Sequence, residues 1–203
     1  MGTRQKFSAA LIGIGIILAV LPYNGHSSLT GRTNEVALEV FNENAFLSVD
    51  KVAQMIVNED SSLRLIDLRP AEQCNAFSLP GAVNLPYEKF ISADPSEILG
   101  PGNIKNVIYS NGDTQSSYAL VIAKGMKHQN VFVMKGGMNE WFSTIMNSRF
   151  TGGRISPAEN AIFETRTRAS RLFSEINSLP DSLKEKLRES KKLAAKKLDG
   201  GCE

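Results

Sequence analysis

The sequence NVIYSNGDTQSS, from Asn106 to Ser117, places a short apolar run directly before a small polar loop. Val107–Tyr109 predicts a buried strand, and the apolar residues that follow the loop, at 118, 121 and 122, have helical spacing. A junction of strand, loop and helix directs several backbone N–H groups at one point. That arrangement suits an anion or an activated nucleophile, so the loop is a candidate functional site.

The same alternation of strand and helix continues on both sides of this junction. Further strands are predicted at Leu63–Leu68, Ala82–Leu85 and Val131–Met134. Helical spacing of apolar residues occurs at 49–56, 118–126 and 139–146, and Ser48 can cap the first of these helices. Strands that alternate with helices predict an α/β domain in which helices flank a small, mostly parallel sheet.

Four motifs follow one another in a fixed order through this region. They are LIDLRP with Glu72 behind it, LPGAVNLP, VIYS and VFVMKGGMNEW. In this order and spacing the region resembles a rhodanese-like domain. The resemblance covers Phe46 to Met146, and it places the domain at residues 45–150.

The resemblance implies structural roles for several residues outside the loop. They are Asp67, Arg69, Glu72, Gly136, Gly137 and Trp141. Arg69 is expected to pair with Glu72 or with a neighbouring carboxylate. The two glycines are expected to form the turn after the fourth strand, and Trp141 is expected to anchor the packing behind it.

In this family the loop after the third strand begins with a cysteine and often ends in arginine and serine. Here the loop is Ser110, Asn111, Gly112, Asp113, Thr114, Gln115 and Ser116. Ser110 takes the cysteine position and Gln115 the arginine position, while Asp113 adds a negative charge. Sulfur transfer requires a thiolate that can carry a persulfide, which a serine hydroxyl cannot do. We therefore expect no sulfurtransferase activity from the loop, and no catalytic residue is assigned to it.

Two thiols elsewhere in the chain leave an alternative open. Cys74 is expected in a loop between the first two strands, and Cys202 lies one residue from the end of the sequence. Either could serve sulfur transfer or thiol redox chemistry in place of the missing cysteine. The opposing interpretation is that Cys74 is a partly buried structural residue and that Cys202 has no role.

The first 23 residues combine Arg4 and Lys6 with an apolar run at 7–21. This pattern predicts a signal anchor or a cleaved signal peptide, because the run is shorter than the roughly 20 residues of a relaxed transmembrane helix. Both interpretations place the domain outside the cytoplasm, either membrane-anchored or secreted and periplasmic. Residues 24–44 then read as a linker, in which the alternation at 36–40 predicts a short edge strand or a docking segment.

Residues 151–203 predict a charged helical C-terminal extension. Ser156, Pro157 and Glu159 have the spacing of a helix start, and Pro180 and Asp181 interrupt the helical pattern. Leu172, Phe173 and Ile176 are expected to pack on the domain or on another subunit. The basic segment 183–198 fits an anionic membrane surface, a protein partner or a solvated helix.

Composition excludes several classes of function. A net charge of +2 does not indicate a nucleic-acid partner, and the two histidines and two cysteines form no metal-ligand motif. We expect no cofactor and no metal. The sequence therefore predicts a non-catalytic, membrane-associated binding or scaffold module built on a rhodanese-like domain.

Overall fold

The computed structural model describes residues 42–92, 99, 102–150, 156–184, 186, 187 and 189. By its internal contacts the chain divides into two units, Met1–Thr30 and Gly31–Glu203, and every described residue belongs to the second. The hydrophobic run 7–21, the predicted segment 36–40 and Cys202 lie outside the described residues. Across the ranges that are described, no helix is both long and apolar enough to cross a membrane.

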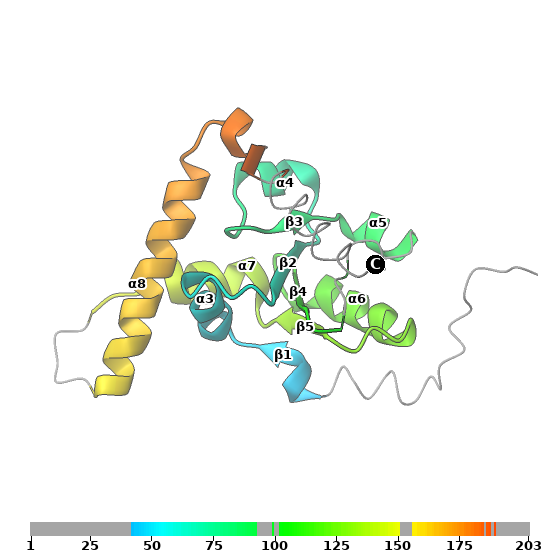
Figure 1. The fold of residues 1–203 in the computed structure, drawn as a ribbon, viewed down its shortest axis with the longest axis horizontal. Helices are drawn as coiled ribbons and strands as arrows, with labels where there is room; N and C mark the ends of the chain where they lie inside the picture. Colours follow the sequence, from blue (N-terminus) through cyan, green and yellow to red (C-terminus); the bar gives the residue numbers. More distant parts are fainter. Residues whose placement is uncertain are drawn as a thin grey trace, which may run out of the picture. The chain divides into compact units, whose positions relative to one another are not determined.

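Five parallel strands form the sheet at the centre of the domain (Figure 1). They are β1 Phe46–Leu47, β2 Leu63–Asp67, β3 Val83–Asn84, β4 Lys105–Tyr109 and β5 Val131–Met134, in the order β1-β5-β4-β2-β3. The predicted α/β class and its parallel sheet are confirmed. The two-residue strand β1 was not predicted, because so short a strand shows no period that a sequence could reveal.

The helices are α3 Val49–Val57, α4 Ala71–Ala76, α5 Tyr87–Ser92, α6 Asp113–Gly125, α7 Gly137–Glu140 and α8 Pro157–Asn177, with the short 3-10 helix η1 at Glu43–Ala45. Ser48 accepts a hydrogen bond from the Lys51 N–H at the start of α3, as expected. The helix predicted at 139–146 is divided in two, since α7 continues into a π-helix, η3, at Trp141–Met146. Neither α4 nor α5 was predicted, because each is only six residues long.

Alternating residues of the central strands build a core on each face of the sheet. Leu65, Val107 and Tyr109 pack into one cluster, whereas Ile66 and Ile108 pack into the other. The first cluster is covered by α3, α7, η3 and α8, and the second by α5 and α6. Figure 1 shows these two groups of helices on opposite sides of the strands.

Helix α8 is part of the first core cluster. It begins with a capping box between Ser156 and Glu159, with Pro157 at its first position, which confirms the predicted helix start. Its Ala169 and Phe173 are buried against the domain, and Leu172 packs at the edge of the same cluster. The C-terminal segment therefore contributes apolar side chains to the core of the domain.

Two polar contacts attach α8 to the rest of the domain. At the middle of the helix, Arg166 donates from Nε and Nη2 to both carboxylate oxygens of Asp50 on α3, at 2.7 Å each. At its end, Asn177 accepts from the Ser78 N–H at 2.9 Å and donates to the Ser78 carbonyl at 3.0 Å. The side-chain amide of Asn177 thus pairs with both backbone polar groups of Ser78, which lies in the segment between α4 and β3. Beyond Pro180 the chain is helical again at Asp181–Lys184.

Candidate functional site: the loop after strand β4

The candidate loop lies where β4 ends and α6 begins. β4 ends at Tyr109, Ser110 follows it, and Gly112 is the N-cap of α6. The helix was expected at Tyr118 but begins at Asp113. Four of the seven predicted loop residues, from Asp113 to Ser116, therefore form the first turn of α6. This turn was not predicted because its residues are polar and show no helical spacing of apolar side chains.

The Ser110 hydroxyl is buried and hydrogen-bonded. Its Oγ donates to Gln115 Oε1 at 2.6 Å, and Ser110 is only 3% exposed. Gln115 therefore supplies an amide oxygen to the Ser110 hydroxyl. A neutral amide accepts a hydrogen bond but does not remove a proton, so this contact does not generate a nucleophile.

Asp113 holds the loop to the turn that follows β5. Its carboxylate accepts a hydrogen bond from the Gly136 N–H at 2.6 Å. Two backbone bonds join the same two segments: Met138 N–H donates to the Ser110 carbonyl at 2.9 Å, and Asn139 N–H donates to the Asn111 carbonyl at 3.0 Å. The Asp113 carboxylate thus attaches the loop to the turn after β5.

Two further side chains of the loop are in contact with its surroundings. Asn111 is exposed, and its Nδ2 donates to Gln73 Oε1 on α4 at 2.9 Å. Ser116 is buried, and its hydroxyl donates to the carbonyls of Gly112 and Asp113 within the first turn of α6. Thr114 is exposed. The loop therefore presents a small polar surface made by Asn111, Asp113 and Thr114, over a hydrogen-bonded base.

Asp67 and Arg69 form a buried ion pair beside this loop. Arg69 Nη2 lies 2.6 Å from Asp67 Oδ2, and both side chains are fully buried. The partner of Arg69 is thus the neighbouring carboxylate of Asp67. Glu72, the other expected partner, is exposed and forms no ion pair within the described residues.

The same guanidinium organises the segment that follows α4. Nη2 of Arg69 donates to the Phe77 carbonyl at 2.7 Å, and the guanidinium carbon lies 4.8 Å from the centre of the Phe77 ring. Burial lowers the pKa of Arg69, but the hydrogen bonds to Asp67 and the charge of that carboxylate outweigh burial and raise it overall. Burial, and then the charge of Asp67, raises the pKa of the Tyr109 hydroxyl well above its usual value. Arg69 is therefore a cation and Tyr109 a neutral hydroxyl at physiological pH.

The structure places Cys74 away from the surface. It lies in helix α4, where a loop was expected, and its side chain is fully buried. Because the Cys74 side chain is buried, access of any substrate to its sulfur is limited. Among the described residues, no group of three or more His, Cys, Asp and Glu side chains could hold a metal ion.

Gly136, Gly137 and Trp141 surround the turn to which the loop is attached. Trp141 is fully buried, and its ring lies 6.2 Å from that of Phe173 on α8. Gly137 has a φ of +56°, and a Cβ added to it would overlap the Ser110 carbonyl oxygen and lie 2.8 Å from the Asn111 carbonyl carbon. Only glycine permits this close approach of two backbones.

We expect Gly137→Ala to lower the free energy of unfolding by roughly 1–3 kcal/mol, since it combines a left-handed backbone with this overlap. The loop should also lose protection from hydrogen exchange at Met138 and Asn139. Gly112→Ala is the matched control, because a Cβ at Gly112 meets no atom within 4 Å. The measurement is urea unfolding. Equal stability of the two variants would contradict the close approach of the Gly137 backbone to the backbone of Ser110 and Asn111.

Several residues of the site could not be identified from the sequence. Gln73 on α4 and the backbone of Met138 and Asn139 are brought to the loop by the fold. No motif marks Gln73, which stands 38 positions before its partner Asn111. The glycine pair at 136 and 137 is the local signal that predicts the turn.

Residues 48–144 match the family model described as a rhodanese-like domain. The adenylyltransferase and sulfurtransferase UBA4 of Meyerozyma guilliermondii is 31% identical over 88 residues, which are 40% of this chain and 20% of that protein. The chain therefore spans a small part of the length of that relative.

Two solved structures have a similar fold. One is the rhodanese-like domain of the Anabaena protein Alr3790, with 20% identity, a TM-score of 0.44, and coverage of 55% of this chain and 88% of that one. The other is the human single-domain sulfurtransferase TSTD1, with 18% identity, a TM-score of 0.39, and coverage of 49% and 96%. On the match of the family model, together with the parallel sheet and its flanking helices, the chain carries a rhodanese-like domain.

Proposed function

We propose that this rhodanese-like domain is a non-catalytic binding module that uses the surface of its former active loop. The observation that carries the proposal is the hydrogen bond from Ser110 to Gln115. A hydroxyl stands where sulfur transfer would need a thiolate, and its proton is donated to a group that cannot accept it as a base. The loop is thus built for a fixed shape, which is what a binding surface requires.

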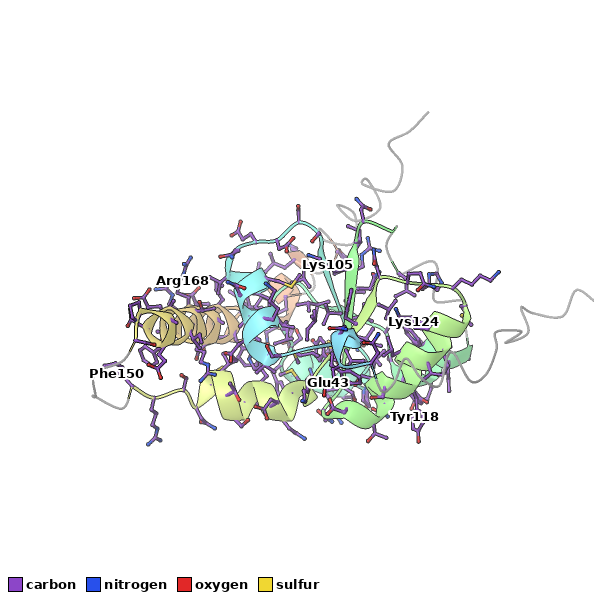
Figure 2. The ribbon with its side chains drawn as sticks, turned by 90° about the horizontal axis from the view of Figure 1, so that it is seen from below. Glu43, Lys105, Tyr118, Lys124, Phe150 and Arg168 are labelled. Atoms are coloured by element: carbon purple, nitrogen blue, oxygen red, sulfur yellow. The ribbon has the colours of Figure 1, made fainter. Side chains whose placement is uncertain are left out.

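The exposed face of α6 supports this proposal. Tyr118 is 60% exposed, and Figure 2 shows it on the outer side of the domain, where α6 faces solvent. Thr114 lies one helical turn before it, so the two side chains share a face of the helix. Tyrosine is among the residues that contribute most to protein interfaces, because it combines a large apolar ring with a hydroxyl. We infer that the partner is a protein that contacts Asn111, Thr114 and Tyr118.

The association with a membrane through residues 7–21, and the location of the domain outside the cytoplasm, belong to the same proposal. The basic and apolar pattern of the first 23 residues supports them. Mass determination of the N-terminus of the mature protein, after membrane fractionation, tests both. A mature chain that begins near residue 24 in a soluble fraction would replace the anchor with a cleaved signal.

The first test of the function measures catalysis. We expect the full chain to transfer no sulfur from thiosulfate to cyanide, and we expect no persulfide on the protein by mass spectrometry. Turnover that is lost in Cys74→Ala or in Cys202→Ala would overturn the non-catalytic proposal in favour of the thiol alternative. The chain with Ser110 is compared with the double variant Ser110→Cys and Gln115→Arg. This variant shows whether the domain can still support sulfur transfer once the cysteine and the arginine are present.

The second test measures binding. Proteins captured by the full chain are expected to be lost from the double variant Thr114→Arg and Tyr118→Glu. The control is Leu183→Glu with Leu187→Glu, which changes two side chains that are 45% and 43% exposed beyond α8. Loss only in this control would move the partner site to the C-terminal helices. Substitution is preferred to deletion here, because α8 contributes to the core and its removal would disturb the whole domain.

A further inference from the structure

Asn111 and Gly112 form the one asparagine-glycine pair in the described part of the chain. Asparagine is a chemically labile residue, and its side-chain carbonyl carbon can be attacked by the backbone nitrogen of the residue that follows. Glycine after asparagine favours this attack, because it has no Cβ to crowd the ring that forms. The pair therefore has a reactivity that the binding function does not use.

The local structure leaves both reacting groups accessible. Asn111 is exposed, and Gly112 has an extended backbone with φ −140° and ψ −160°. Apart from its two chain neighbours, no atom would lie within 4 Å of a Cβ added at Gly112, so the space beside the Gly112 Cα is open. None of the hydrogen bonds among the described residues uses the Gly112 N–H.

We propose that Asn111 is a site of spontaneous deamidation that changes the surface of the loop. The Gly112 nitrogen loses its proton and bonds to Cγ of Asn111, and the Cγ–Nδ2 bond breaks to release ammonia. Water then opens the resulting cyclic imide at either carbonyl, which gives aspartate or isoaspartate. The net reaction consumes one water, releases one ammonia and involves no oxidation or reduction.

The product differs from Asn111 at the contact that joins the loop to α4. The hydrogen bond from Asn111 Nδ2 to Gln73 Oε1 is lost, because the Nδ2 group has left. A carboxylate oxygen of the product now faces the amide oxygen of Gln73. A new negative charge also lies two residues from Asp113. In isoaspartate the backbone runs through Cβ and Cγ, so the Asn111 carbonyl that accepts from the Asn139 N–H becomes a free carboxylate outside the backbone. Deamidation thus detaches the loop from α4, and this consequence does not depend on the proposed function.

The experiment incubates the full chain at 37 °C over a series of pH values and follows the peptide that contains Asn111 by mass spectrometry. We expect Asn111 to deamidate faster than Asn147, an exposed asparagine followed by serine, with a rate that rises with pH. In Gly112→Ala the rate at Asn111 should fall about tenfold or more, because the added Cβ crowds the ring. The same variant is expected to keep the fold, so a change in rate reports the chemistry.

Two results would overturn the inference. One is a rate at Asn111 no higher than at Asn147, and the other is an equal rate in Gly112→Ala. Asn111→Asp tests the consequence separately, since it should increase hydrogen exchange in the loop and in Ala71–Ala76 relative to Asn111→Gln. Unchanged exchange in Asn111→Asp would show that the contact with Gln73 does not hold the loop.

Discussion

Replacing Phe173 by alanine is expected to lower the free energy of unfolding by about 3–5 kcal/mol, the usual cost of removing a buried aromatic ring. Phe173 is only 5% exposed, and its ring centre lies 5.6 Å from that of Phe142 and 6.2 Å from that of Trp141. A cavity there would open between α8 and η3, whose Trp141 and Ile145 belong to the same buried cluster. The measurement is urea unfolding, followed by the fluorescence of Trp141, the single tryptophan of the chain.

Ile162→Ala is the matched control for this experiment, because Ile162 lies on the same helix and is 45% exposed. Its effect should be well below that of Phe173→Ala, since much of its side chain is already in contact with water. Similar and small effects of the two substitutions would mean that α8 does not complete the core. The C-terminal segment would then be a helical extension that adds little to the stability of the domain.

Asp67→Ala is expected to have a comparable effect, about 3–5 kcal/mol, because it leaves a buried guanidinium without its counter-charge. Arg69 would retain the Phe77 carbonyl and the Phe77 ring as partners, but neither carries a full negative charge. The loss should appear in urea unfolding as a lower midpoint with little change in slope.

Two further variants separate the buried charge from the general effect of substitution. Asp67→Leu with Arg69→Met should recover much of the lost stability, since no unpaired charge remains in the core. Arg171→Ala removes an ion pair with Glu175 whose side chains are 70% and 62% exposed, and it should cost at most about 1 kcal/mol. If Asp67→Leu with Arg69→Met is as unstable as Asp67→Ala, the hydrogen bonds and packing of the Arg69 guanidinium stabilise the fold, and the unpaired charge is not the cause of the loss.

The elements that sequence reasoning identified are those whose signal is local. The apolar runs of β2, β4 and β5 and the caps of α3 and α8 depend on neighbours within a few positions. Ser48 and Ser156 each accept a hydrogen bond from the residue three positions ahead, so the spacing alone indicates a helix start. The first turn of α6 was missed because its residues Asp113–Ser116 are polar and show no helical period.

The contacts that define the site and the core connect segments far apart in the chain. Asn111 and Gln73 are 38 positions apart, Asn177 and Ser78 are 99, and Arg166 and Asp50 are 116. No local pattern distinguishes these polar residues from others that face solvent. Their pairing follows from the order of the strands and from the face of the sheet on which each helix packs.

The sequence by itself determined the class of the fold, the order of its strands along the chain and the serine at the position where the family has a cysteine. Only the tertiary structure decided that Cys74 is buried in α4, that Arg69 pairs with Asp67, and that Ser110 donates to Gln115. It also decided that α8 carries Phe173 into the core. The physical reason is that hydrophobic period and capping act over a few residues, whereas burial and the choice of a polar partner depend on which segments the folded chain brings together.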